Sequence, residues 1–416
     1  MAAVAGSIRL DRSYGFFLIL VALALPWSTS LVAIFVVAAL VTMAPFFDRQ
    51  AFLQSLKRLA SLLPVALFFL ALIGTLWSDG PWGVRLYAVG PSAKLLMVPV
   101  LFYHFERSSR GLQVFAAFLV SCIALMAMSW LVAFDPHLAL KSGAGYGVPI
   151  KNYIDQSQEF ALCAVVLAYP VVGLFRSGRI MPALLLSAIA LSFVINMAFV
   201  VVSRTALVTM PVMLAVFAIL HLGWRSRLAV LCAAIVLAGL AFAASPKLRS
   251  TIDTFSREYQ AYEERNLATS IGERLEFWKK SLHFIADAPV IGHGTGSIKR
   301  LFEQASTGPA GAASAEVIAN PHNQTLNVAV QWGMLGVIIL YAMWLSHLML
   351  FRQDGLMAWI GLMVAVQNFF TSLFNSHIFD FTEGWMYVLG VGIAGATMLD
   401  ASRREMPAGT PNSSRT

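Results

Sequence analysis

Long apolar runs alternate with short polar connections along most of this chain. A perpendicular helix needs ~20 apolar residues to cross a bilayer, and tilt or burial in protein accommodates shorter runs. Apolar runs of this kind cover residues 14–26, 29–45, 59–76, 91–105, 112–134, 158–175, 182–202, 205–222, 227–244, 325–350, 356–374 and 383–399. Barrel strands would instead alternate apolar and polar positions in short segments. The pattern therefore predicts an all-α polytopic membrane protein with about twelve transmembrane helices.

The one long polar connection covers residues 245–324. Its pattern predicts helices near 246–265, 271–286 and 298–305. Ser270 and Glu273 have the spacing of a capping box at the start of the second helix. The glycine-rich stretch "GHGTGS" at 292–297 is interpreted as a flexible hinge, and "STGPAGAAS" at 306–314 as a mobile linker.

These elements divide the chain into nine transmembrane helices, a helical loop domain, three further helices and a polar tail. The predicted boundaries are 1–244, 245–324, 325–399 and 400–416. The first run also resembles a signal peptide, since Arg9 and Arg12 precede it. Because a second apolar run follows at once, a retained membrane helix is expected.

Composition supports membrane insertion: 58% of residues are hydrophobic and 12% are charged, against about 25% charged in soluble domains. The formal net charge is +8. Lysine and arginine gather in alternate connections, which the positive-inside rule places in the cytoplasm together with both chain ends. The 245–324 loop is then outside. No pattern indicates nucleic-acid binding, and no Cys/His spacing indicates a metal site.

Polar residues that interrupt the apolar pattern are the candidates for chemistry. His322, in "NPHNQ" before the run at 325–350, is either an interfacial helix-start residue or a general base near neutral pH. Arg204, in "VVSRTAL", either snorkels to lipid headgroups or binds phosphate in the bidentate manner of a guanidinium. Arg274, in "GERLEFWKK", lies on a solvated helix face or grips phosphate, and Arg265 is a weaker candidate of the same kind.

Further candidates lie in other connections on the predicted outer side. Lys151, in "GVPIKNYIDQSQEF", has an interfacial loop as its simpler interpretation. Asn323 is placed to orient His322 or a sugar. Asp380, beside His377 in the last connection, is placed to orient a histidine or accept from a sugar hydroxyl. The charge bias puts all of these residues on one side of the membrane.

Two stretches together resemble the O-antigen ligase and polymerase superfamily. The first is "SIGERLEFWKKSLHFIADAPVIGHGTGS", and the second is "NPHNQTLNVAVQWGMLGVIIL". The matching positions are Arg274 and Trp278, Pro289 with Gly292, Gly294 and Gly296, His322-Asn323 with Leu326, and Gly333 with Gly336. "SRTAL" at 203–207 is similar to the family's arginine at a span edge.

The resemblance implies a metal-independent, inverting glycosyltransferase of the membrane GT-C type, without a cofactor, in a bacterial inner membrane. Such ligases move O-antigen glycan from undecaprenyl diphosphate to lipid A–core oligosaccharide on the periplasmic face. His322 would be the base, and Arg204 and Arg274 would hold the diphosphate. O-antigen polymerases and protein O-oligosaccharyltransferases share this chemistry and stay open as alternatives. A transporter or flippase is the alternative from another class, although no internal repeat is evident.

Overall fold

Helices make up nearly all of the computed structural model, which describes residues 14–143 and 145–405. Nine segments of this part are long and apolar enough to cross a membrane, and shorter apolar helices cover Tyr14–Ala24 and Leu356–Thr371. The apolar helices after Tyr14–Ala24 are α2 (Thr29–Met43), α4 (Leu59–Ile73), α5 (Trp82–Val89) with α6 (Met97–Phe105), α7 (Gly111–Phe134), α8 (Tyr153–Val166) with α9 (Ala168–Arg176), α10 (Ile180–Phe199), α11 (Arg204–His221), α12 (Trp224–Ala244), α16 (Gln324–Leu350) and α17 (Leu356–Thr371). The last helix, α18 (Phe381–Glu405), packs against α6 and α17. The expected all-α polytopic membrane fold is confirmed.

Several helix bounds differ from the predicted runs. The fourth segment begins at Trp82 rather than 91, because Gly90 and Pro91 start a 3-10 turn (Gly90–Leu96) that continues the helix instead of breaking it. Helix α8 begins at Tyr153 rather than 158, since Asn152 caps it and its polar first turns are buried inside the bundle. Helix α18 extends to Glu405, beyond the predicted end at 399. The chain ends, residues 1–13 and 406–416, lie outside the described part, and their cytoplasmic placement stays a prediction.

The bundle packs most tightly around α6, α17 and α18. Glycines on α18 allow this approach: a Cβ at Gly392 would lie 2.6 Å from Leu101, and one at Gly390 would lie 2.6 Å from Val364. By contrast, α12 buries none of its residues although its sequence is almost wholly apolar. An apolar helix that is exposed over its whole length needs a lipid environment.

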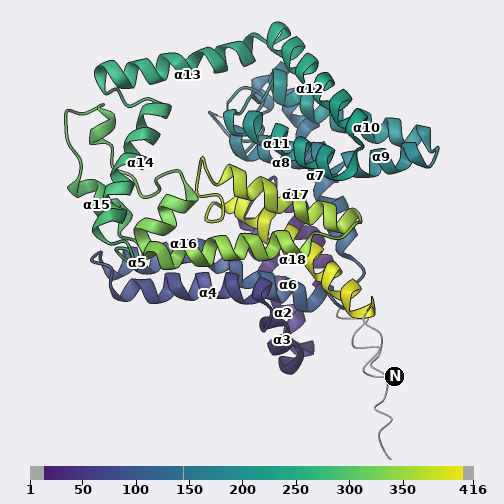
Figure 1. Cartoon of the computed structure of the whole chain (residues 1–416), viewed down its shortest axis with the longest axis horizontal. Coiled ribbons are helices and arrows are strands. Elements are labelled where there is room, and N and C mark those ends of the chain that lie inside the picture. The colour runs from purple at the N-terminus through teal and green to yellow at the C-terminus, as the bar shows by residue number, and fades with distance from the viewer. Residues whose placement is uncertain (1–13, 144, 406–416) are drawn as a thin grey trace, which may run out of the picture.

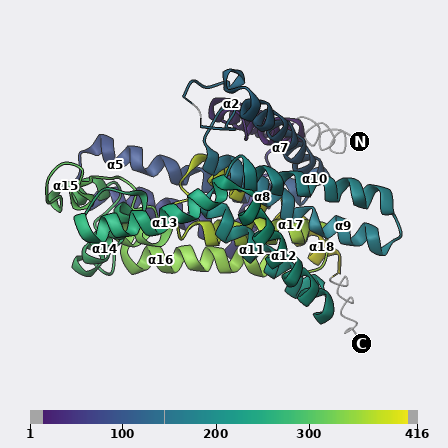
Figure 2. The same cartoon turned by 90° about the horizontal axis from the view of Figure 1, so that it is seen from above.

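The loop helices lie beyond one end of the bundle. Figures 1 and 2 both place α14 (Ser270–Asp287) and α15 (Ile298–Gln304) at one end of the long axis and the α9–α10 connection at the other. Helix α13 (Pro246–Arg265) links α12 to these helices along the top of Figure 1. The three helices predicted in the loop are confirmed to within a residue or two.

The predicted capping box is wrong by one residue. Thr269 is the N-cap of α14, and its hydroxyl accepts from the Gly272 amide at 3.1 Å. Ser270 is already helical, so Glu273 lies a residue too far along to reach back to the cap.

The glycine-rich stretch is a tightly packed joint, and the hinge interpretation is wrong. Gly294 has φ +85°, and a Cβ there would lie 2.6 Å from the Ser78 backbone. Gly292 approaches the backbone of Gln331 as closely. Glycine is required here because the loop and the membrane helices meet backbone to backbone.

The joint continues into a kink of α16 at Gly333, where φ is 59° and ψ is −155°. The kink frees backbone amides, and loop carbonyls accept from them: Met334 donates to Pro289 at 2.8 Å and Leu335 to Val290 at 3.2 Å. Non-helical backbone is tolerated at a membrane helix where protein satisfies it in this way. The Pro289, glycine-rich and Gly333 motifs therefore form one docking site for the loop.

The segment 306–314, predicted as a mobile linker, is held by hydrogen bonds. The Thr307 amide donates to the Ser314 carbonyl at 3.0 Å, and Lys280 Nζ donates to the same oxygen at 2.6 Å. Ala312 pairs with Leu267 in an isolated antiparallel bridge. The small polar residues thus build a folded-back turn against α13 and α14, which composition alone did not distinguish from a linker.

Candidate active site

His322 lies at the loop end of the bundle, between the loop and α16, in an unusual backbone conformation. Its φ is +52°, in the left-handed region that non-glycine residues seldom adopt. Its backbone amide donates to Asn320 Oδ1 at 3.0 Å, which closes an Asx turn around Pro321. Asn323 then caps α16 by accepting from the Leu326 amide at 3.1 Å. The turn and the cap together hold His322 in this conformation.

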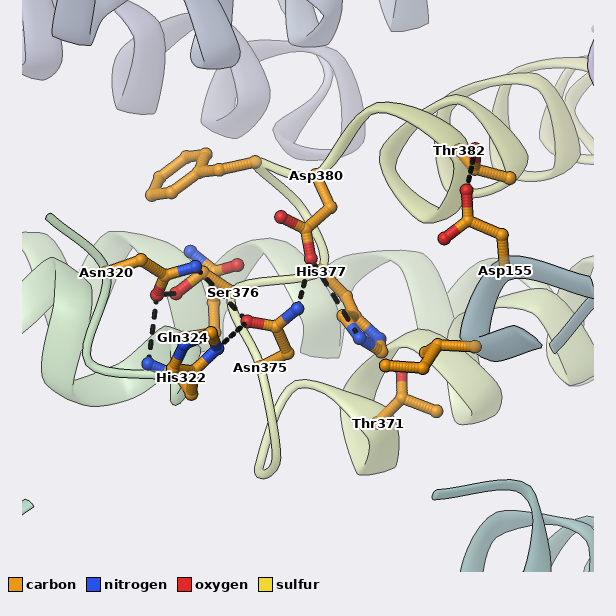
Figure 3. Close-up of polar contacts among 12 residues, drawn as sticks. Asp155, Asn320, His322, Gln324, Thr371, Asn375, Ser376, His377, Asp380 and Thr382 are labelled. Carbon is orange, nitrogen blue, oxygen red and sulfur yellow. Dashed lines mark hydrogen bonds and ion pairs between the residues drawn. The ribbon is translucent and has the colours of Figure 1, made fainter. Parts of the chain in front are cut away.

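Amide side chains fix which ring nitrogen of His322 carries the proton (Figure 3). Asn320 Oδ1 accepts from a backbone N–H, so its Nδ2 must be the group that donates to Asn375 Oδ1 at 3.1 Å. Asn375 Oδ1 also faces His322 Nδ1 at 2.9 Å, and an oxygen there can only accept. Nδ1 therefore carries the hydrogen, and in the neutral ring the free lone pair is on Nε2.

Asp380 supports the same assignment from the other side. Asn375 Nδ2 donates to Asp380 Oδ2 at 2.6 Å, so a flipped Asn375 amide would set oxygen against carboxylate. Asp380 itself is held by Lys94, whose ammonium donates to the carbonyls of Ile378, Phe379 and Asp380. The row His322–Asn375–Asp380 is visible in Figure 3.

Burial sets the ionisation of these groups. It lowers the pKa of His322; the hydrogen bond with Asn375 opposes this shift, and the charge of Arg274 adds to it. Burial raises the pKa of Asp380 to about 6, against the opposing charge of Lys94. Burial also lowers the pKa of His377 to about 3, so its 4.0 Å contact with Asp380 is not an ion pair. At neutral pH His322 is uncharged and able to accept a proton at Nε2.

Helix α14 brings an arginine next to this histidine. Phe277, 2% exposed, stacks on the His322 ring with centroids 6.2 Å apart and planes at 30°. Arg274 lies one turn earlier on the same face. Burial lowers the Arg274 pKa, and the charge of Arg204 lowers it further. Arg274 makes no hydrogen bond or ion pair with any residue that the structure describes.

Arg274 and Arg204 line one polar cavity of about 470 Å³. We call it the arginine cavity; its polar lining includes Tyr153, Arg204, Lys247, Thr254, Glu258 and Arg274. Arg204 is the first residue of α11, and its two terminal nitrogens each lie 2.8 Å from an oxygen of Glu258 on α13. The guanidinium thus faces the loop and does not snorkel to lipid. His322 does not line this cavity, but the charge of Arg274, which does, acts on the histidine. The guanidinium groups can bind an anionic group in the cavity, and the neutral histidine can take a proton from a hydroxyl.

Three other predicted site residues lie elsewhere. Lys151 donates to the Leu25 carbonyl and to Thr382 Oγ1, the latter at 3.0 Å, and so ties three membrane segments together. Arg265 is exposed at the last residue of α13 and does not line the arginine cavity. Asn323 donates to the Leu373 carbonyl and caps α16, so its side-chain hydrogen bonds go to these partners and not to the His322 ring.

Comparison with known proteins locates the family signal in the same part of the chain. Residues 189–341 match a family model described as O-antigen ligase. This part of the chain is therefore similar to the O-antigen ligase family. The matched part contains Arg204, Arg274 and His322.

A curated relative extends the comparison without naming an activity. It is an uncharacterised protein of Haemophilus influenzae, 26% identical over 157 residues. That alignment covers 36% of this chain and 39% of the relative.

The residues that support His322 were missed by the sequence-based interpretation. Asn375 is a neutral amide in a loop, with no motif to mark it, and Asn320 was not assigned a role although it begins the "NPHN" stretch. Lys94 counted only as a topology charge, although it is 9% exposed and holds the Asp380 turn. Asp380 was noticed for its proximity to His377, whereas it acts on His322 through Asn375. The "NPHN" stretch did carry a signal, since an asparagine two residues before a histidine favours an Asx turn.

Proposed function

We propose that this protein is an O-antigen ligase, which transfers glycan from undecaprenyl diphosphate to lipid A–core oligosaccharide on the periplasmic face of a bacterial inner membrane. One observation carries the proposal: a neutral His322, with Nε2 left to accept a proton, stacks on Phe277 one turn from Arg274, and Arg274 lines the arginine cavity without an ion pair to any described residue. This arrangement supports acceptor activation next to diphosphate binding.

In the proposed reaction, the acceptor hydroxyl oxygen attacks the anomeric carbon of the donor glycan. A bond forms between that oxygen and carbon while the bond from carbon to diphosphate oxygen breaks. The hydroxyl proton passes to His322 Nε2, and undecaprenyl diphosphate leaves with the bonding electrons. Attack from the face opposite the diphosphate inverts the anomeric centre.

Arg274 and Arg204 would bind the donor diphosphate and stabilise the charge that develops as it departs. Guanidinium groups suit this role because they are planar, permanently charged and bidentate toward phosphate. The lipid chain would stay in the bilayer beside the helices. The chemistry needs no metal ion, because fixed cations meet the electrostatic demand, so EDTA should leave the activity of the purified protein intact.

Lipopolysaccharide from a bacterium lacking this gene tests the assignment. A ligase predicts a core without any O-antigen, together with accumulated lipid-linked polymer. A core that bears a single repeat unit would indicate a polymerase instead. Unchanged lipopolysaccharide, with loss of solute uptake or lipid flipping, would contradict both and favour a transporter.

A further inference from the structure

The arginine cavity contains a protein carboxylate where the proposed function requires an anion. Both terminal nitrogens of Arg204 bond to the two oxygens of Glu258 at 2.8 Å, and the side chains are only 23% and 18% exposed. Two parallel charge-assisted bonds are the geometry in which a guanidinium also binds phosphate. The Phe255 ring lies against a flat face of the same guanidinium, with its centroid 4.7 Å from Arg204 Cζ, so the N–H edge that holds Glu258 stays the anion-binding edge.

The cavity keeps an excess of positive charge even though Glu258 pairs with Arg204. Its lining carries three cationic side chains, Arg204, Lys247 and Arg274, against one carboxylate, Glu258. Arg274 forms no hydrogen bond or ion pair with a described residue, and burial, followed by the charge of Arg204, lowers its pKa. The cavity therefore favours further negative charge, and a diphosphate carries more charge than the carboxylate does.

Glu258 belongs to a helix that few buried contacts hold. Leu248 is the one buried residue described in α13. The Arg204–Glu258 pair therefore links the middle of α13 to the membrane helices. The Glu258 carbonyl also accepts from Thr269 Oγ1 at 3.0 Å, and Thr269 is the N-cap of the helix that carries Arg274. The position of Glu258 is thus connected to both arginines.

We propose that Glu258 is a resident anion of the diphosphate site. It neutralises Arg204 while the site is empty and is displaced when the donor diphosphate binds across Arg204 and Arg274. This inference rests on the proposed function, because it assumes that the arginine cavity takes a diphosphate. Donor binding then exchanges one bidentate partner of Arg204 for another and releases α13 from the membrane helices at this point.

Binding of inorganic pyrophosphate to the purified full-length protein tests the proposal, at constant ionic strength because screening alters such affinities. Glu258→Gln removes the competing carboxylate with little change of shape. We expect it to bind pyrophosphate about tenfold more tightly than the wild type, since like charges in one site oppose each other strongly. Glu264→Gln makes the same charge change at an exposed position of α13 and should bind as the wild type does.

Two further variants guard against a folding artefact. Glu258→Asp keeps the charge but cannot reach Arg204 in the same bidentate geometry, so we expect a smaller gain in affinity. Adding Arg204→Ala to Glu258→Gln should abolish the gain, which a double-mutant cycle would register as coupling. If the wild type binds pyrophosphate and both Glu258 variants bind it equally or more weakly, this proposal is overturned, while the proposed function still stands. No binding in any variant would overturn the diphosphate site itself.

Discussion

His322 combines a left-handed backbone with a fixed ring tautomer. The backbone conformation costs free energy, about 1–3 kcal/mol for a residue of this kind, and the surrounding turn and helix cap compensate for it. The tautomer follows from a chain of amide constraints that begins at a backbone N–H. The backbone conformation sets the position of the ring, and the tautomer leaves Nε2 as the proton acceptor. A histidine that only started a helix would need neither feature.

Replacing Asn375 tests the tautomer argument. Asn375→Leu is similar in size but removes the acceptor for Nδ1, so the ring can turn or take the other tautomer. We expect kcat to fall about 100-fold or more, since changing the carboxylate that orients a catalytic-triad histidine costs about 10⁴-fold, while pyrophosphate binding is unchanged. Asn375→Asp keeps an acceptor and can share a proton with Asp380, so it should restore part of the rate. Equal loss of binding and rate in Asn375→Leu would indicate a merely structural role.

Arg274 should affect the pH dependence of the reaction as well as donor binding. The active form of His322 is neutral, so kcat/KM falls as the pH drops through the His322 pKa, which lies below the ordinary value. Arg274 contributes to lowering that pKa. Arg274→Gln should therefore move the acidic limb of the pH profile to higher pH and weaken donor binding. Arg265→Gln, at an exposed position outside the cavity, is the matched control and should leave the pH profile unchanged. If the acidic limb of the profile does not move in Arg274→Gln, the account is contradicted.

At the scale of single residues, the sequence pointed to charged and titratable side chains, whereas the supporting neutral amides could not be recognised from it. Arg204, Arg274 and His322 were recognisable because charged or titratable groups at span edges are costly and motifs surround them. Asn375 and Asn320 were not, because an amide's role depends on contacts between segments more than fifty residues apart. Arg265 and Lys151 were proposed from their charge, but the charge alone did not determine which way the side chain points.

At the scale of elements, the joint between the glycine-rich stretch and α16 determines where the loop lies. The kink at Gly333 and the positive φ of Gly292 and Gly294 allow backbone contacts that any Cβ would prevent. The joint positions α14 over the start of α16, and so holds Arg274 and Phe277 next to His322. A rigid joint of this kind favours a preorganised site.

Gly294→Ala should destabilise the protein without touching the site. The new Cβ would meet the Ser78 backbone at 2.6 Å, and φ +85° is strained for alanine. We expect a loss of about 2 kcal/mol or more in the free energy of unfolding, measured as a lower Tm in detergent. Gly239→Ala on α12 has open space around it and should leave Tm unchanged or slightly higher. Equal Tm values for the two variants would favour the hinge interpretation.

Helices could be predicted from the sequence where a local signal alone indicates them. The helix near 271–286 was found from the capping signal at its start, which lies one residue from the actual N-cap. The hinge and linker interpretations failed because glycine marks both flexible segments and close backbone contacts, and only the contacting partner distinguishes them. The polar start of α8 was missed because its side chains are buried inside the bundle rather than facing lipid.

At the scale of the whole molecule, the site lies where three parts of the chain meet. The loop helices supply Arg274 and Glu258, α11 supplies Arg204, and the connection between α17 and α18 supplies Asn375 and Asp380. All of these lie at the loop end of the bundle, which agrees with the one-sided placement inferred from charge. Composition and apolar run length predicted the membrane architecture, whereas the assembly of the site depends on packing. The periplasmic position of that end stays a prediction.

The central claim is that His322 removes the acceptor proton while the arginines hold the donor. Its most direct test is glycan transfer by purified protein supplied with undecaprenyl-diphosphate glycan and lipid A–core, with pyrophosphate binding measured on the same samples. The account predicts that His322→Ala loses transfer but still binds pyrophosphate, whereas His283→Ala, at an exposed loop position, retains both. Transfer at the wild-type rate by His322→Ala would contradict it.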